Sequence, residues 1–334
     1  MPTSHFLVLF LIAALFLSPD SALAQAPAEP SGKAIGEAVE IVNGAELLSG
    51  SLLVPDGEGP HPAFVAIEGS GGASFRNSWM DGYFPFWKDI AEFLVSHGYA
   101  VLLFDKPGVH ESTGNWRRQS FDDRAKESMA AVRHLAIRDD IDSTRIGLIG
   151  HSQGGWIAQI AGAHHPDEVA FLVLLAGPSV SVKQQIRDDT VGAWTCRGLS
   201  GINLTAHRTG LDLWLGALSL VAHVTKPGYL PRIIHFDPRG VLPEIRQPTL
   251  AIFAEHDYLV VPETNQARLN RYFGSAQHDA RLAIQSVAGA DHFFRASTRC
   301  ADGQKPSKWA PGFFEALGDT EYWTWIRALD TEPF

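Results

Sequence analysis

The segment Gly150–Gly154 reads Gly-His-Ser-Gln-Gly, and it joins an apolar run, Ile146–Ile149, to a stretch with helical spacing. A sharp strand-to-helix turn brings neighbouring backbone close to the serine, and glycine at both ends leaves room for that approach. Ser152 would then stand above the end of a sheet, at a helix N-terminus where developing negative charge is favoured. The segment predicts a nucleophilic serine, and an ordinary strand–helix turn is the alternative.

The rest of the chain alternates strand and helix patterns. Short apolar runs of strand type occur at Val39–Val42, Leu47–Val54, Ala63–Ile67, Ala100–Phe104, Arg145–Ile149, Val169–Leu175, Thr249–Phe253 and Leu282–Val287. Helical spacing occurs at Phe84–His97, from Ser120 onward with Asp123 as its capping partner, at Gln153–His164 and at Phe313–Leu329. Solidly apolar strands are typical of a mostly parallel sheet with helices on both faces, so we expect an α/β fold. The first two runs, which flank Asn43-Gly44, predict an antiparallel hairpin.

The N-terminus has the pattern of a secretion signal. Phe6–Leu17 is an unbroken apolar run, too short to span a bilayer, and small residues follow at Ala22–Ala24. We expect a signal peptide at 1–24, a loose leader at 25–36, and a secreted or periplasmic protein without stable membrane insertion after cleavage. The α/β core is expected at 37–177 and 240–334. The helical-looking segment 178–239 lacks a clear strand and predicts an inserted cap.

Composition narrows the class of protein. Of the 334 residues, 45% are hydrophobic and 19% are charged, which is typical of a globular chain. The net charge of −10 without a cluster of Lys or Arg argues against nucleic acid as a partner. The two cysteines lack the spacing of a zinc site, and no nucleotide-binding glycine motif is present, so we expect neither a metal nor a cofactor.

A serine nucleophile needs a base and an acid that orients the base, and turns of this type occur in the order Ser, Asp or Glu, His. Asp257 follows the predicted strand Thr249–Phe253, with Glu255 as the competing acid. His292 follows the last predicted strand, which distinguishes it from the other histidines of the chain. His151 and His256 are interpreted as structural neighbours of the site. The predicted catalytic residues are therefore Ser152, Asp257 and His292.

Acyl transfer also needs donors for an oxyanion. One would be the backbone N–H of Gln153, the residue after the nucleophile. The other would come from the glycine-rich loop after the strand Ala63–Ile67, with Ser70 as the first candidate and Gly71 as the second.

With these motifs, the chain resembles the α/β-hydrolases, close to secreted esterases and serine-aminopeptidase-like enzymes. The resemblance rests on Gly69–Gly71, Asp105–Gly114, Gly150–Gly155, Asp257 with Val261-Pro262, and Gly289–His292. It implies an eight-stranded sheet, cofactor-free acyl hydrolysis, and a cap between the sixth strand and the strand that carries the acid. Pro107 and His110 depart from the family loop, which usually has Arg and Gly there. Glu68 is a further departure, because a carboxylate beside an oxyanion hole opposes catalysis unless it is paired or protonated.

Three functions compete at this point. The first is a carboxylic ester hydrolase, the second a peptidase or amidase on the same triad, and the third a non-catalytic binding protein. The expected partner is a small-molecule ester or a short peptide. Trp194, Trp214 and Leu218 of the cap are candidate substrate-binding residues, and packing of the cap is their alternative role. The sequence identifies no acidic group in the cap that would bind a peptide N-terminus.

The two cysteines, Cys196 and Cys300, lie in loop-like sequence far apart in the chain. An oxidising compartment would favour a disulfide, which would tie the cap to the loop that carries His292. Two free thiols are the alternative.

Overall fold

The computed structural model describes residues 35–226, 228–276, 280–301 and 308–329. The expected signal peptide at 1–24, and all but the last two residues of the expected leader at 25–36, lie outside the described residues.

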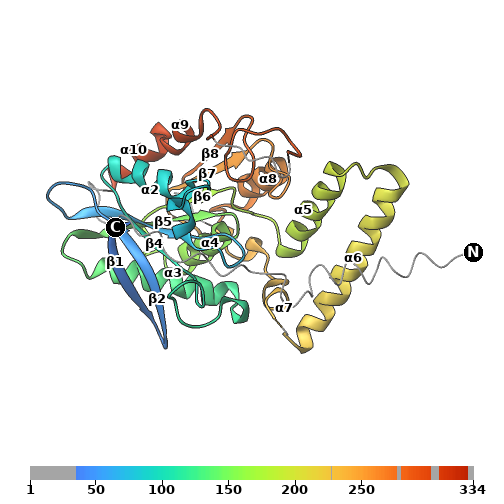
Figure 1. Cartoon of the computed structure of the whole chain (residues 1–334), viewed down its shortest axis with the longest axis horizontal. Helices are drawn as coiled ribbons and strands as arrows, with labels where there is room; N and C mark the ends of the chain where they lie inside the picture. Colours follow the sequence, from blue (N-terminus) through green and yellow to red (C-terminus); the bar gives the residue numbers. More distant parts are fainter. Residues whose placement is uncertain (1–34, 227, 277–279, 302–307, 330–334) are drawn as a thin grey trace, which may run out of the picture.

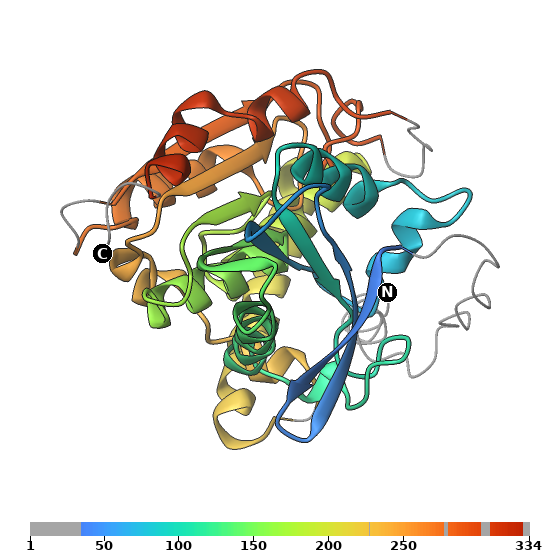
Figure 2. The same cartoon turned by 90° about the vertical axis from the view of Figure 1, so that its left-hand side faces the viewer.

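One eight-stranded sheet runs through the molecule in the spatial order β1-β2-β4-β3-β5-β6-β7-β8. Neighbouring strands from β4 onward are parallel, and β1 and β2 are attached antiparallel at one edge. Figures 1 and 2 show the twist of the sheet and the long β1–β2 hairpin at its edge. The strand bounds are β1 Glu37–Asn43, β2 Glu46–Leu53, β3 His61–Ile67, β4 Ala100–Phe104, β5 Ile141–His151, β6 Leu172–Leu175, β7 Thr249–Ala254 and β8 Leu282–Val287. The predicted α/β fold with a mostly parallel sheet is confirmed.

Helices cover both faces because the strands are apolar on both sides. In β4, Leu102 belongs to one buried cluster and Leu103 to the other, as expected for side chains that alternate across a sheet. The first cluster includes α3 (Phe121–Ala136), α4 (Gln153–His164) and α8 (Pro262–Tyr272). The second includes α2 (Phe86–Ser96), α9 (Phe313–Leu317) and α10 (Thr320–Ala328). The predicted capping box of Ser120 and Asp123 begins α3.

Two elements differ from the sequence prediction. The strand predicted at Arg145–Ile149 begins earlier, because β5 continues back to Ile141, whose backbone pairs with β3. The single helix predicted at Phe313–Leu329 is two helices, separated at Gly318. Asp319 caps the second helix by accepting the N–H of Tyr322, so a polar side chain interrupts an otherwise helical apolar pattern.

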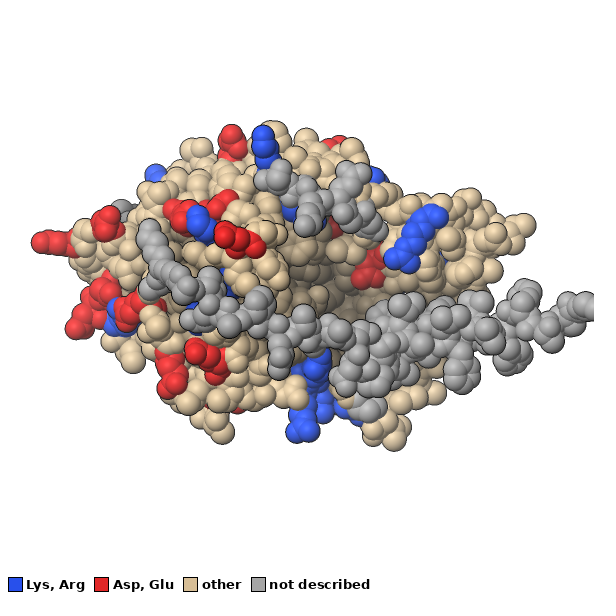
Figure 3. Space-filling model, in the orientation of Figure 1, with Lys and Arg blue, Asp and Glu red and all other residues tan. Residues whose placement is uncertain are grey.

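Three helices lie between β6 and β7: α5 (Val182–Cys196), α6 (Gly201–Val224) and α7 (Leu230–Ile233). Figure 1 shows α5 and α6 projecting from the body as a pair, and Figure 3 shows the surface hollowed between that pair and the body. A Cβ added to Gly192 of α5 would approach the carbonyl oxygen of Tyr258 to 2.8 Å, so α5 packs closely on the loop that follows β7. Short 3-10 helices complete the fold at Phe75–Trp79, Trp116–Arg118, Pro238–Gly240 and Leu242–Glu244.

Within the described ranges, no helix combines the length and the apolar character needed to cross a membrane.

Candidate active site

Ser152 occupies the turn between β5 and α4 with φ 52° and ψ −123°. A positive φ is uncommon for a residue with a side chain, and such backbone persists only where the surroundings enforce it. Its N–H donates to the carbonyl of Leu175 at the end of β6, and its own carbonyl accepts the N–H of Gly155, at 2.9 and 2.8 Å. The turn is therefore held by the neighbouring strand and by the first turn of the helix.

The glycines around Ser152 allow this conformation by close backbone packing. A Cβ on Gly150 would lie 2.2 Å from the carbonyl oxygen of Gly154, and one on Gly154 would lie 2.2 Å from that of Ile67. The helix therefore packs against its own strand and against the end of β3. This is the glycine pattern from which the sequence predicted the turn.

Asp257 and His292 lie together at the adjacent strand ends. The Nδ1 of His292 is 2.6 Å from the Oδ2 of Asp257, and both side chains are buried. The other oxygen of Asp257 accepts the N–H groups of Leu259 and Val260 at 2.8 and 2.9 Å. The carboxylate is fixed from both sides, so it holds the imidazole in one orientation.

The electrostatics around His292 favour its charged form. Burial lowers its pKa, but the charge and hydrogen bond of Asp257, together with the charges of Asp291 and Asp189, outweigh burial and raise the pKa above its ordinary value. His151 shows the opposite behaviour, because burial and the charge of His292 lower its pKa to about 3.

His151 connects the histidine loop to the serine turn. Its Nε2–H donates to the carbonyl oxygen of His292 at 3.0 Å, and the two imidazole rings are 4.9 Å apart between centroids. Since His151 directly precedes Ser152, this contact brings the backbone of His292 to the serine turn.

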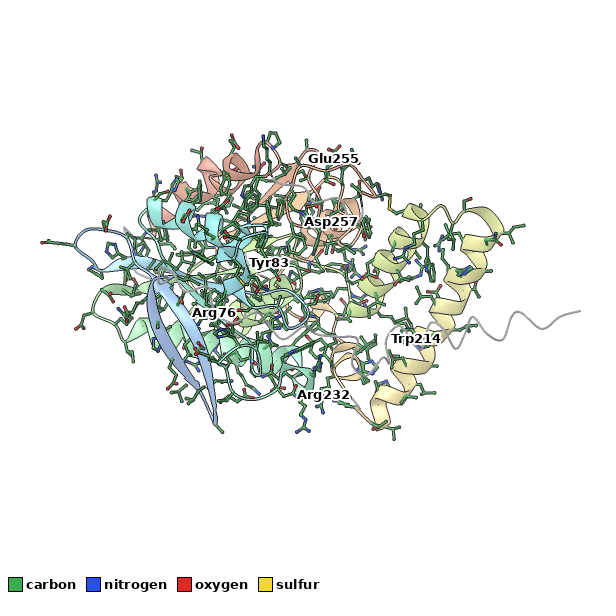
Figure 4. All side chains as sticks on the ribbon, viewed as in Figure 1. Arg76, Tyr83, Trp214, Arg232, Glu255 and Asp257 are labelled. Carbon is green, nitrogen blue, oxygen red and sulfur yellow. A yellow bond between two sulfur atoms is a disulfide. The ribbon has the colours of Figure 1, made fainter. Side chains whose placement is uncertain are left out.

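The competing acid, Glu255, takes a different role. Its carboxylate accepts the N–H of Gly289 at 2.7 Å, which braces the loop before His292. His256 likewise contacts the carbonyl of Ser297, with its Nδ1 at 2.7 Å. In Figure 4, Asp257 lies on the side of the body that faces the cap, whereas Glu255 lies nearer the outer edge. The geometry favours Asp257 over Glu255 as the partner of His292.

The glycine-rich loop after β3 lies beside the serine. A Cβ on Gly69 would approach the Cβ of Ser152 to 3.3 Å, so the loop backbone runs directly past it. Ser70 is exposed and Gly71 is partly exposed. Gln153 is buried, and its side-chain oxygen accepts from the hydroxyl of Tyr229 at 2.6 Å. Both predicted sources of oxyanion donors therefore flank Ser152.

Comparison with known proteins agrees with this fold. The family model described as the alpha/beta hydrolase fold matches residues 62–194. The esterase EstD of Thermotoga maritima is 26% identical over 239 residues, which cover 70% of this chain and 55% of that protein. A 2-hydroxy-6-oxononadienedioate/2-hydroxy-6-oxononatrienedioate hydrolase of Pseudomonas sp. is 25% identical over 233 residues, covering 64% of this chain and 77% of the relative. The crystal structure of a 2,6-dihydroxy-pseudo-oxynicotine hydrolase superposes with a TM-score of 0.53 at 22% identity, over 83% of this chain and 72% of that one.

The chain therefore has the α/β-hydrolase fold. The predicted eight-stranded sheet is the sheet of that fold. The chain spans only about half the length of the Thermotoga esterase.

The structure accommodates the departures of this chain from the family loop. Position 110 has φ 49°, the left-handed region in which a family glycine is favoured, and histidine is among the side chains that tolerate it best. Asp105, which is fully buried, accepts from the hydroxyl of Ser74 and the N–H of Phe75, at 3.0 and 3.2 Å. Its carboxylate also lies 3.4 Å from the Nε of Arg76. Arg76 therefore pairs with this carboxylate, although the chain has proline at position 107, where the family usually has arginine.

The three candidate substrate-binding residues lie in the cap and are partly buried against the core. Trp194 packs edge-on against His207, with ring centroids 5.3 Å apart. Figure 4 shows Trp214 on α6, in the part that projects from the body. A hollow of about 110 Å³ beside His292 is lined instead by the acid and histidine loops, including Asp257, Phe293 and Cys300. A substrate role for Trp194, Trp214 and Leu218 stays a prediction.

Sequence reasoning missed three polar residues near the site. Burial raises the pKa of Asp189 of α5 to about 7, while hydrogen bonds from Thr190 and the charge of His292 oppose that shift. Tyr229 and Arg124 both donate to the side chain of Gln153. Of these three residues, only Arg124 could have been noticed in the sequence, because it interrupts the apolar face of its helix. No group of three or more potential metal ligands occurs among the residues that the structure describes.

Cys196 and Cys300 form a disulfide, with their Cα atoms 5.1 Å apart and a sequence separation of 104. It joins the C-terminal end of α5 to the loop that follows His292, and Cys300 lines the hollow beside the histidine. The interpretation as two free thiols is therefore wrong.

We expect Cys196→Ser/Cys300→Ser to lower the free energy of unfolding by about 4 kcal/mol, because a cross-link across a loop this long removes much unfolded-state entropy. Chemical denaturation of the oxidised protein and of the double variant measures the difference. Thiol titration of the denatured, unreduced wild type supplies the control. Two reactive thiols per chain in that control would contradict the disulfide.

Proposed function

We propose that the protein is a serine hydrolase of carboxylic esters, with Ser152 as nucleophile, His292 as general base and Asp257 as the group that orients the histidine. The observation that carries the proposal is the 2.6 Å contact between His292 Nδ1 and Asp257 beside a serine in a strained strand–helix turn. The esterase and hydrolase names of the relatives support the reaction class.

The reaction follows from these positions. Ser152 Oγ attacks the ester carbonyl carbon while Nε2 of His292 takes its proton. The resulting oxyanion accepts hydrogen bonds from backbone N–H groups of Gln153 and of the Gly69–Gly71 loop. Collapse of the tetrahedral intermediate breaks the bond between the acyl carbon and the alkoxide oxygen. The alkoxide takes the proton from His292 and leaves as the alcohol. Water, deprotonated by His292, then attacks the acyl-enzyme, and the carboxylic acid is released as Ser152 recovers its proton.

We also propose that the protein is exported and that the segment 178–239 forms a cap over a small-molecule site. The Cys196–Cys300 disulfide supports export, because such bonds persist in oxidising compartments. The same bond attaches the cap to the histidine loop, which supports a covering role for the segment.

Ser152→Ala is expected to lower kcat for p-nitrophenyl esters by about 10⁴-fold or more with little change in Tm, because no other group supplies the nucleophile. Steady-state kinetics across ester chain lengths measures this. A fluorophosphonate probe should label wild-type Ser152, as shown by peptide mass spectrometry. Turnover close to wild type in the variant would rule out this mechanism.

The pH dependence follows from the raised pKa of His292. A general base works only when neutral, so kcat/KM should fall as the pH drops through an inflection above the ordinary histidine value of about 6.5. Asp257→Asn should cost about 10³–10⁴-fold in kcat, because it removes the group that holds the imidazole in the required tautomer. Glu255→Gln is the matched control, and a larger loss there than in Asp257→Asn would assign the acid to Glu255.

Asp189 favours amide hydrolysis as the second candidate function. A carboxylate on α5 within electrostatic reach of His292 could bind the protonated amine of an aminoacyl substrate. The charge of that amine would in turn lower the pKa of Asp189 and keep the carboxylate ionised at neutral pH.

If the amine binds there, Asp189→Asn should raise KM for aminoacyl p-nitroanilides by about tenfold, the effect of losing roughly 1.4 kcal/mol of binding, and leave neutral esters unaffected. Asp212→Asn, on α6 and paired with Arg187 instead, is the control. Equal effects on both substrate types, or no anilide hydrolysis by the wild type, would leave ester hydrolysis as the sole function.

A further inference from the structure

Lys106 is a buried cation directly behind the loop that runs past Ser152. Its side chain is 1% exposed, and its Nζ donates to the carbonyl oxygens of Gly69 and Gly71 at 2.7 and 2.6 Å. The lysine follows β4, whereas the two glycines follow β3, so the contacts join the ends of adjacent parallel strands. Sequence reasoning assigned Lys106 no role.

These two bonds determine how the loop peptides face. A peptide unit is planar and trans, so its carbonyl and its N–H point in opposite directions. With the carbonyl of Gly69 turned toward Lys106, the N–H of Ser70, in the same peptide unit, is turned away from the lysine. Ser152 lies close to this unit, since a Cβ on Gly69 would approach the serine Cβ to 3.3 Å. The N–H of Gly71 belongs to the next unit, whose carbonyl is not one of the two that Lys106 holds.

We infer that Lys106 is a positioning residue that orients the Gly69–Ser70 peptide unit so that the N–H of Ser70 serves as the second oxyanion donor. This inference rests on the proposed serine-hydrolase function. It also selects Ser70 over Gly71, the two donors that the sequence left open.

Arg124 of α3 supports the same arrangement from the helix side. Its guanidinium donates to the carbonyl of Glu68 at 3.2 Å and to the side-chain oxygen of Gln153 at 3.4 Å. The side chain is 2% exposed, and its Nε lies 3.2 Å from the carboxylate of Glu127. One cation therefore contacts the residue before Gly69, and also Gln153, whose backbone N–H is the other proposed donor.

The alternative role of Lys106 is to balance buried negative charge. Glu68 is the neighbour concerned: burial raises its pKa, while Lys106 lowers it, as do hydrogen bonds from Trp87 and the N–H of Gly69. Burial and the charge of Arg124 in turn lower the pKa of Lys106 to about 7. The ammonium and the neutral amine both carry at least two N–H donors, so the contacts to the two carbonyls survive a change of protonation.

A pair of variants separates the two roles. Lys106→Met removes the donors and also the stronger of the two cationic charges that act on Glu68, the other being Arg124, so it should lower both kcat and Tm. Glu68→Gln/Lys106→Met removes both charges, so the stability lost with the lysine should return while the loop remains untethered. Kinetics with a p-nitrophenyl ester, thermal unfolding, and the rate of fluorophosphonate labelling of Ser152 are measured for each.

For both variants we expect kcat to fall by about 10–10²-fold with KM within twofold of wild type, since a displaced donor costs somewhat less than a deleted one. The labelling rate should fall in parallel, because the phosphonyl oxygen uses the same donors. Recovery of both Tm and kcat in the double variant would show that Lys106 serves only charge balance and would overturn the inference. If Lys106→Met does not fold, the double variant alone decides, and wild-type kcat in it rejects the role.

Failure of the proposed function would appear differently. It would be seen as an absence of fluorophosphonate labelling at Ser152 in the wild type, whatever residue stands at position 106.

Discussion

The strained backbone of Ser152 is the constraint on which the site depends. A residue with φ 52° must be held from outside, and the neighbouring strand β6 and the first turn of α4 hold it through hydrogen bonds. Gly150 and Gly154 lie where the backbones of α4, of β5 and of the end of β3 come very close to one another. Every loop that carries a proposed functional group leaves the same edge of the sheet, because parallel strands end together there.

Charged side chains behind the site are buried, and they pair with one another or with nearby polar groups. Asp105, Lys106, Arg124 and Glu127 are all buried, and Lys106 and Arg124 donate to carbonyl oxygens of the loop that passes Ser152. Burial raises the pKa values of Asp105 and Glu127 to about 7 and lowers that of Lys106 to about 7, and the charges of both carboxylates oppose the shift of Lys106. A loop rich in glycine has little intrinsic preference for one conformation, and cations that bind its carbonyls supply the missing constraint.

The cap is attached to the site at two places. Close packing of Gly192 on Tyr258 brings α5 against the acid loop, and the Cys196–Cys300 disulfide joins the end of α5 to the histidine loop. The carboxylate of Asp189 lies on the same helix, three residues before Gly192. The loops that carry Asp257 and His292 are therefore the elements on which α5 is held, so the proposed cap and the proposed catalytic groups share their support.

The sequence by itself determined the α/β fold and the position of the serine turn, because both depend on local patterns: apolar runs, capping residues, and glycines at fixed spacing. It also placed Asp257 and His292 after the correct strands, since such positions meet at one sheet edge. Only the tertiary structure decided that Asp257 contacts His292 while Glu255 accepts the N–H of Gly289. The two carboxylates are two residues apart on one loop, and the direction in which each side chain points depends on the folded backbone. The same holds for the disulfide, for Asp189, and for the contacts of Lys106 with two carbonyls 35 and 37 residues away, since contacts between distant segments leave no periodic trace in the chain.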